Sequence, residues 1–573
     1  MKKIITFFLL LILSTNLFAC SKNNSSNSVN DNDKELFLQN IPLINQATEY
    51  ALEYNYIPTY FYKNGNIPMI DINKFVRSLK GFINVDKMTY SLNKEENQIT
   101  QQWISNNYTY MLTANWQLDT IYVNDMGFFK NTEEQEGIDY IRNGKWEDCY
   151  SSQKKPVNFN IGNYYFDILF YNDLVLIPLP ILNVLFCSTN QTNILYNGEE
   201  YHFYYSTPPS DIAKKMRESS LNGTFCPNDI RQASINGLLF TMDYFYGLND
   251  YKDIDSFKNY IGEKLLNNLW NNSSNVFNNA YINIFQKKLD ELHTNLIYPS
   301  VYNELEDKFD IYNESNIGER WEDYYTSLAQ LEEKYSQIFN NEKLVRFEGN
   351  TAFIKFNSFD VAPTGILYES NGSISEEAWK YDTFFMMLKA MQEIQLNTST
   401  HNIVIDLTTN GGGSLGAMYQ ALGFLTNKNI ELPCYNTLTN EFRKDYYSID
   451  SDNDFSYDDN DAYTNYKWFI LTSKNTFSAA NCFTSVAKNM GIATIIGEKS
   501  GGGMCSVMPC SLLDGTIYRI SSNNSLRYAY FEAETNKTIY NEIESGIKPN
   551  YEINRDDFYN LEFLDNFLNS IKK

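Results

Sequence analysis

The chain is poor in the residues that most often build metal and disulfide sites. Its 573 residues include three His and eight Cys, and no two cysteines form a Cys-x-x-Cys pair. The spacing therefore predicts neither a zinc site nor a disulfide framework. Cys482 and Cys505 are interpreted as small core residues, with oxidation of some cysteine pair outside the cytoplasm as the alternative.

Basic residues are also scarce. The chain has 46 Lys and Arg against 70 Asp and Glu, a formal net charge of −24. Such a surface repels phosphate backbones, which excludes nucleic acid as a partner. Beyond the N-terminus, the apolar stretch from Leu174 to Phe186 is interrupted by Pro178 and Pro180. It is therefore not predicted to cross a membrane.

The N-terminus has the pattern of an export signal. Lys2 and Lys3 precede an apolar run from Ile4 to Leu13, which is short for a membrane span. The following Leu-Phe-Ala-Cys resembles a bacterial lipobox, in which cleavage before Cys20 leaves that cysteine carrying a lipid. We expect residues 1–19 to be a lipoprotein signal peptide and residues 20–34 a flexible polar tether. The alternative is a signal peptide cut nearby, with an incidental cysteine.

The remaining chain is too long for one ordinary core and divides into four predicted regions. Residues 35–145 form an accessory α+β module, and residues 146–229 a second accessory strand-helix module. Residues 230–350 are mostly helical. Residues 351–573 alternate strands and helices, which predicts an α/β core with a mainly parallel sheet.

Two loops of this core are candidates for function. The predicted strand 403–407 runs into a turn at Asn410–Gly413, and the strand 468–472 runs into a turn that ends at Ser478. In a parallel sheet, both turns lie at the carboxyl ends of their strands. We therefore expect them to meet at one rim of the sheet.

Ser478 opens a predicted helix, Ala479–Met490. The free N–H groups and the dipole at a helix N-terminus favour negative charge. A serine nucleophile passes through an anionic intermediate, so it can use this field. The alternative is that Ser478 only caps the helix, a position at which serine is common.

Three stretches, in this order, resemble the tail-specific (C-terminal-processing) serine peptidase family, whose relatives include the tricorn core protease. They are Asn402–Gly413 (NIVIDLTTNGGG), Trp468–Val507 around Ser478, and Glu542–Ile553 (EIESGIKPNYEI). The resemblance extends from about Tyr281 to the C-terminus. It implies a serine peptidase that acts on a peptide or protein substrate and needs no cofactor and no metal.

The catalytic base differs from that of the tail-specific branch. That branch has a lysine about two dozen residues after the serine, where this chain has Gly501–Gly503. The tricorn-like branch has a histidine ahead of the core, and His293 matches its Asp-x-His-Thr-like element. The resemblance therefore implies His293 as base, with Lys499 as the alternative.

The resemblance also implies the remaining site residues. Glu544, or else Glu542, would orient the histidine or shape its network. A glycine allows a substrate carbonyl to approach the main chain, so Gly412 or Gly411 would form an oxyanion hole with the N–H of Ala479.

These assignments predict a lipid-anchored serine endopeptidase of the cell envelope, on the periplasmic or extracellular face of a bacterial membrane. A different class of function is a catalytically inactive peptide-binding lipoprotein that keeps the fold.

One acidic loop has calcium-like spacing. Asp450, Asp452, Asp454, Ser456 and Asp461 fit a calcium-binding pattern, but Phe455 occupies the position that requires glycine. We interpret this segment as an acidic, solvated loop.

Overall fold

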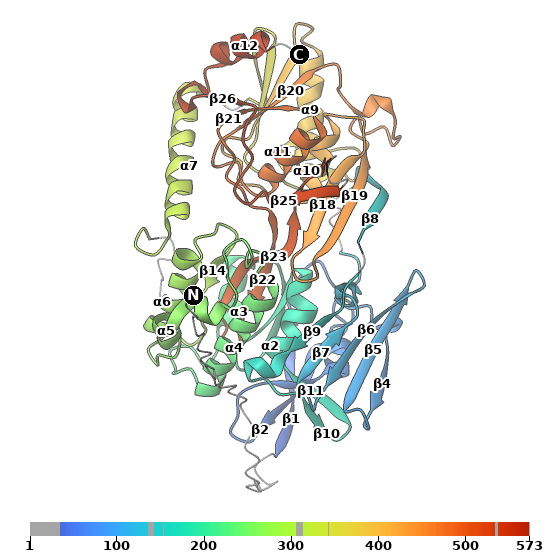
Figure 1. The fold of residues 1–573 in the computed structure, drawn as a ribbon, viewed down its shortest axis with the longest axis vertical. Coiled ribbons are helices and arrows are strands. Elements are labelled where there is room, and N and C mark those ends of the chain that lie inside the picture. Colours follow the sequence, from blue (N-terminus) through green and yellow to red (C-terminus); the bar gives the residue numbers. More distant parts are fainter. Residues whose placement is uncertain are drawn as a thin grey trace, which may run out of the picture.

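A computed structural model describes residues 35–571 except 136–141, 153, 305–312, 342, 533 and 535–536. The N-terminal half of the chain forms the lower part of the molecule and the C-terminal half forms most of the upper part (Figure 1). The predicted signal peptide, the tether and Cys20 lie outside the described residues. Among the helices that are described, none is both long and apolar enough to cross a membrane.

A six-stranded sheet forms the centre of the upper part. Its strand order is β15-β16-β17-β20-β21-β26, and every pair is parallel except β15 with β16. The strands are β15 (Val345–Glu348), β16 (Thr351–Lys355), β17 (Asn402–Asp406), β20 (Lys467–Thr472), β21 (Thr494–Gly497) and β26 (Tyr551–Glu552).

Helices cover both faces of this sheet because its strands are apolar on both sides. Ile403 and Ile405 of β17 pack into the main core with the helices α9, α10 and α11, whereas Val404 packs against α7 and α12. The helices are α7 (Glu319–Ile338), α9 (Thr383–Gln395), α10 (Leu415–Gly423), α11 (Ala479–Met490) and α12 (Leu561–Ser570).

A second six-stranded sheet joins distant parts of the chain, and all of its pairs are antiparallel. Its path is β14-β23-β18-β19-β8, and β22 also pairs with β23. The strands are β8 (Gly144–Ser151), β14 (Asn295–Tyr298), β18 (Ile430–Asn436), β19 (Glu441–Ile449), β22 (Cys505–Ser511) and β23 (Ile517–Leu526). This sheet brings β14, from the helical region, beside two strands of the C-terminal core.

A mainly parallel sheet therefore does not describe the whole fold. Residues 351–573 also contribute β18, β19, β22, β23 and the hairpin β24 (Tyr528–Glu532) and β25 (Lys537–Asn541), all in antiparallel pairs. Alternation of strands and helices identified the parallel layer. It did not identify the strands that connect through hairpins, because a hairpin needs no helix between its strands.

The lower part contains two largely antiparallel sheets. One has the order β10-β11-β3-β2-β1-β13-β12 and the other β4-β5-β6-β7-β9. Strands from both predicted accessory modules pair in each sheet. Their strands are β1 (Leu36–Asn45), β2 (Tyr56–Tyr62), β3 (Met69–Asp71), β4 (Thr89–Asn93), β5 (Gln98–Ser105), β6 (Tyr108–Asn115), β7 (Thr120–Val123), β9 (Val157–Asn160), β10 (Leu169–Tyr171), β11 (Leu174–Pro178), β12 (Thr192–Tyr196) and β13 (Tyr201–Tyr205).

Helix α7 runs along one side of the molecule between its upper and lower parts (Figure 1). It falls in the region predicted to be helical, as do α5, α6 and most of α4. The remaining helices are α1 (Ile72–Ser78), α2 (Leu179–Leu182), α3 (Ser210–Arg217), α4 (Asn228–Phe245), α5 (Phe257–Leu269), α6 (Ser274–Ile282) and α8 (Thr364–Leu367).

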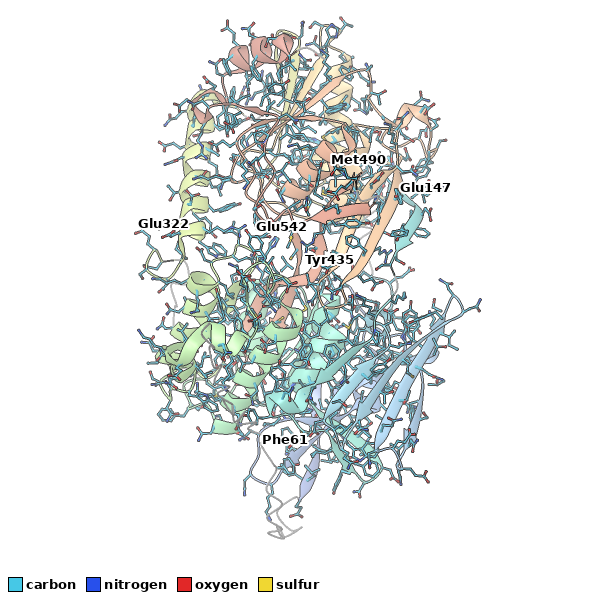
Figure 2. All side chains as sticks on the ribbon, viewed as in Figure 1. Phe61, Glu147, Glu322, Tyr435, Met490 and Glu542 are labelled. Carbon is cyan, nitrogen blue, oxygen red and sulfur yellow. The ribbon has the colours of Figure 1, made fainter. Side chains whose placement is uncertain are left out.

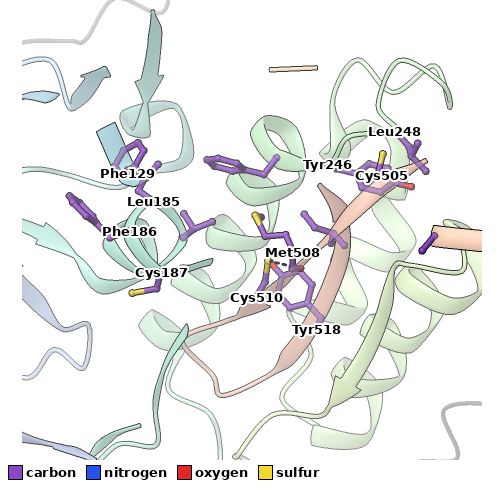
Figure 3. Close-up of a cluster of buried hydrophobic side chains, with 14 of the residues drawn as sticks. Phe129, Leu185, Phe186, Cys187, Tyr246, Leu248, Cys505, Met508, Cys510 and Tyr518 are labelled. Atoms are coloured by element: carbon purple, nitrogen blue, oxygen red, sulfur yellow. Dashed lines mark hydrogen bonds between the residues drawn. The ribbon is translucent and has the colours of Figure 1, made fainter. Parts of the chain in front are cut away.

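One apolar core continues from the accessory region into the C-terminal core. Side chains of β22 and β23 pack beside residues of α4 and of the segment that follows α2 (Figure 3). Cys482 and Cys505 are both buried with free thiols, which confirms their interpretation as core residues. The shared core fixes β23 relative to the lower part of the molecule.

Candidate active site

Ser478 lies in a strained turn between β20 and α11. Its φ is +56° and its ψ −122°, a region that residues with a Cβ seldom occupy. Its N–H donates to Gly502 O at 2.9 Å, and its carbonyl accepts from Cys482 N at 2.9 Å. Its side chain makes no capping bond to the helix. The alternative in which Ser478 serves only as an N-cap is therefore wrong.

The serine turn and the glycine turn lie at one rim of the parallel sheet, as predicted. Phe477 N donates to Asn410 O at 3.0 Å, and Thr476 Oγ1 donates to Leu407 O at 2.7 Å. Asn410 is fully buried, and its Nδ2 donates to Phe356 O at 3.2 Å. These bonds hold the two turns against each other.

His293 comes from outside this sheet and contacts Ser478. It precedes β14, which pairs with β23 of the second sheet. Its Nε2 lies 2.8 Å from Ser478 Oγ, although the two residues are 185 positions apart in sequence. The site therefore forms where the two sheets meet, and this geometry is that of a hydroxyl nucleophile beside a base.

The surroundings of His293 keep its imidazole neutral. Its side chain packs against the ring of Phe477, with ring centroids 4.7 Å apart. Burial, helped by Arg519 and Arg320 and opposed by Glu291, lowers the pKa of His293 to about 4. At neutral pH the ring is uncharged, so Nε2 can accept a proton.

The glycine turn touches the nucleophile, but one predicted role is not met in this conformation. A Cβ on Gly412 would lie 2.6 Å from Ser478 Cβ, so only glycine fits there. The N–H of Gly412 donates to Asn410 Oδ1 at 2.9 Å and is therefore not free for an oxyanion. Within the described chain, the N–H groups of Ala479 and Gly411 form no hydrogen bond.

Gly501–Gly503 form a wall of the site beside the serine turn. Gly502 accepts the N–H of Ser478, and a Cβ on Gly502 would lie 1.7 Å from Glu544 O. Its φ of +86° also favours glycine. This wall occupies the position where the tail-specific branch carries its lysine.

Glu544 supports this wall and does not contact His293 in the described hydrogen bonds. Its Oε1 accepts from Arg320 Nη1 at 2.9 Å, and its Oε2 accepts from Met504 N at 3.0 Å. Arg320 also donates to Gly501 O at 3.1 Å. Burial raises the pKa of Glu544, and Arg320 opposes this shift.

Glu542, the alternative to Glu544, shapes the main chain of the same turn. Its carboxylate accepts the N–H of Glu544 at 2.6 Å and that of Ser545 at 3.2 Å. Glu542 lies near the middle of the molecule, between its upper and lower parts (Figure 2). These contacts make Glu542 part of the turn and not a partner of the histidine.

Lys499 and the other two histidines lie apart from the nucleophile. Lys499 is exposed, and no hydrogen bond in the described chain joins it to Ser478. His202 is buried in β13, where burial lowers its pKa to about 4. His401 is exposed, immediately before β17. Of the two proposed bases, the structure brings only His293 to Ser478.

The sequence did not predict two polar side chains that lie near His293. Ser521 Oγ on β23 lies 3.5 Å from Nδ1, and Glu291 Oε1 lies 3.9 Å from the same atom. Glu291 could have been predicted, because only one residue separates it from His293 in the Asp-x-His-Thr-like element. Ser521 could not have been predicted from the sequence, because it reaches the site only through the pairing of β23 with β14.

A separate cavity lies beside β22 and β23. It measures about 560 Å³ and is lined by the accessory region, the β18–β19 hairpin and residues that include Ser506 and Ser522. Ser478 and His293 do not line it. In the acidic loop, the carboxylates of Asp450, Asp452 and Asp454 converge within 4.8 Å, but they accept main-chain N–H groups of their own loop.

The match to a family model agrees with the class of protein that a serine beside a histidine base suggests, a serine peptidase. Residues 350–553 match the family described as peptidase family S41. The matched segment contains all three of the sequence stretches, so this similarity confirms the resemblance drawn from them. No curated protein matches the chain.

Solved structures similar to the chain include peptidases. A candidate peptidase from Parabacteroides merdae ATCC 43184 has 16% identity and a TM-score of 0.41, over 60% of this chain and 100% of the other. The photosystem II D1 C-terminal processing protease has 17% identity and a TM-score of 0.25, over 38% of this chain and 46% of the other. A candidate S41 protease from Bacteroides fragilis NCTC 9343 has 19% identity and a TM-score of 0.27, over 41% of this chain and 59% of the other.

Proposed function

We propose that this chain is a serine endopeptidase that cleaves peptide bonds through an acyl-enzyme on Ser478. The observation that carries the proposal is the 2.8 Å separation between Ser478 Oγ and His293 Nε2. The match to peptidase family S41 supports the same reaction class. No cofactor or metal takes part in the proposed reaction.

The first step is nucleophilic attack. Neutral His293 accepts the Ser478 hydroxyl proton at Nε2 while Oγ bonds to the carbonyl carbon of the substrate. The strained turn presents Oγ at the start of α11, where the helix dipole favours the negative charge that develops. The product of this step is a tetrahedral intermediate beside an imidazolium ring.

The second step breaks the peptide bond. We propose that the N–H of Ala479 donates to the oxyanion, with a second N–H from the glycine turn. When the intermediate collapses, the C–N bond breaks and Nε2–H gives its proton to the leaving amine. Water then attacks the acyl-enzyme with His293 again as base, which releases the acid and restores Ser478.

Glu544 takes a supporting part in this proposal. With Arg320 it holds the Gly501–Gly503 wall, and Gly502 holds the N–H of Ser478. The pair therefore positions the nucleophile indirectly. The substrate is a peptide or protein, and a chain with a net charge of −24 disfavours nucleic acid.

Location in the cell envelope is part of the proposal and rests on the sequence alone. A lipid on Cys20 would hold the protein to a bacterial membrane, and residues 20–34 would act as the tether. The lipid supplies the membrane affinity, about 0.8 kcal/mol for each buried CH₂ group.

The deciding experiment is active-site labelling with a fluorophosphonate. We expect the wild-type protein to take up one label and to hydrolyse a broad peptide library, and Ser478→Ala to do neither. A folded wild type that takes up no label and cleaves no peptide contradicts the proposal. That result would favour an inactive peptide-binding lipoprotein instead.

A further inference from the structure

Glu291 is a buried carboxylate with few partners. It is fully buried, and its Oε1 accepts the N–H of His293 at 2.7 Å. Among the described residues, its Oε2 has no hydrogen-bond partner. No ion pair to a Lys or Arg satisfies it within the described chain, whereas Glu544 nearby has Arg320.

This arrangement is costly for a residue with only a structural role. A buried carboxylate normally needs an ion pair or several donors to offset the loss of its hydration. One main-chain N–H offsets only part of that loss. A positive charge that forms nearby offsets more of the free-energy cost of burying the carboxylate. The atom of His293 that faces the Glu291 carboxylate is Nδ1, which lies 3.9 Å from Oε1.

During the proposed reaction, His293 becomes a positively charged imidazolium beside Glu291. Proton transfer from Ser478 to Nε2 requires the neutral tautomer with its hydrogen on Nδ1. The acceptors near Nδ1 are Ser521 Oγ at 3.5 Å and Glu291 Oε1 at 3.9 Å. Only the second carries the negative charge that stabilises an imidazolium. Hydrogen bonds of this kind are often long before substrate binds.

We propose that Glu291 is a positioning residue, which fixes the main chain of His293, selects its Nδ1–H tautomer and stabilises the imidazolium. The inference rests on the proposed serine peptidase function. It moves the orienting role from Glu544, which sequence resemblance implied, to a residue in the histidine's own turn. Glu544 is already bound to Arg320 and Met504 N.

Other charged and titratable groups act on the same ring. Arg519 of β23 and Arg320 of α7 lower the pKa of His293, and Glu291 raises it. The groups whose charge interacts with Glu291 are Tyr246, Lys252, His293, Arg320, Cys505 and Glu544. Removal of the Glu291 charge therefore lowers the pKa of His293 further, since the two arginines remain.

The test measures the rate of fluorophosphonate labelling of Ser478 against pH in the full-length protein. We expect Glu291→Gln to label on the order of 100-fold more slowly at pH 7, because the amide no longer stabilises the imidazolium. We also expect its acid limb to move to lower pH. Glu263→Gln, which removes an exposed carboxylate on α5, is the matched control and should behave as wild type.

A conservative variant tests the same idea if Glu291→Gln does not fold. Glu291→Asp keeps the charge but withdraws it by one CH₂ group, so we expect labelling about tenfold slower with an acid limb close to that of wild type. Circular dichroism and thermal unfolding verify the fold of each variant.

The outcomes separate this inference from the proposed function. A wild type that takes up no label contradicts the serine peptidase proposal, and this inference with it. A labelled wild type with Glu291→Gln within threefold of its rate contradicts the inference alone. Slow labelling with an unshifted acid limb also contradicts it, because a merely structural role produces that result.

Discussion

Replacement of His293 by alanine is the sharpest test of the proposed mechanism. The substitution removes the proton acceptor 2.8 Å from Ser478 Oγ and leaves the serine turn, held by Gly502 and Cys482, in place. General-base catalysis contributes roughly 10²- to 10⁴-fold, so we expect turnover to fall by about 10³-fold. This loss corresponds to about 4 kcal/mol of transition-state stabilisation.

The pH dependence gives a second, independent readout. The protonated ring cannot accept the serine proton, so activity is present above the pKa of His293 and is lost as the pH falls through it. With that pKa at about 4, wild-type kcat/KM should be half-maximal near pH 4. The residual activity of His293→Ala should show no limb there, because the group that titrates is gone.

The assay is hydrolysis of a peptide library together with fluorophosphonate labelling, from pH 3.5 to pH 8. His401→Ala, at an exposed histidine, is the control and should retain wild-type activity. Lys499→Ala should also keep most activity. The reasoning is refuted if His293→Ala stays near wild type while Lys499→Ala is inactive, since the lysine would then be the base.

Three further substitutions test other parts of the proposal. Gly412→Val should lower turnover by on the order of 100-fold, because its Cβ would lie 2.6 Å from Ser478 Cβ. A variant that is folded by circular dichroism and fully active would exclude the glycine turn from the mechanism. Glu544→Gln should lower turnover by only about tenfold, because it weakens the bond from Arg320 without removing the base; a loss as large as that of the histidine variant would restore its orienting role. Cys20→Ala should release the protein from membranes, and a variant that still pellets with them after a high-salt wash would rule out the lipid anchor.

The local geometry of the nucleophile was predictable because it depends on neighbours in sequence. An apolar strand, a polar turn and a helix with apolar spacing placed Ser478 at the start of α11, as the structure has it. The glycine runs indicated turns without room for a Cβ, and Gly412 and Gly502 meet that condition. The parallel layer followed from the alternation of strands and helices.

The sequence did not predict how individual groups are used within those turns. Gly412 appeared to be an oxyanion donor, but its N–H is bound to Asn410 Oδ1. Glu544 was expected to orient the histidine or to shape its network, and its carboxylate is bound to Arg320 and to Met504 N. Each outcome depends on which of several nearby acceptors or donors lies within hydrogen-bond distance, and residue type and spacing do not specify such distances.

The sequence by itself indicated the two candidate reacting groups, a serine at a helix N-terminus and a histidine in a family-like element. Only the tertiary structure decided that His293, and not Lys499, reaches Ser478. The histidine arrives through the pairing of β14 with β23, which joins segments more than 200 residues apart, and through the apolar core that fixes β23. Such long-range contacts come from the packing of the whole chain, whereas the serine turn comes from local backbone preferences.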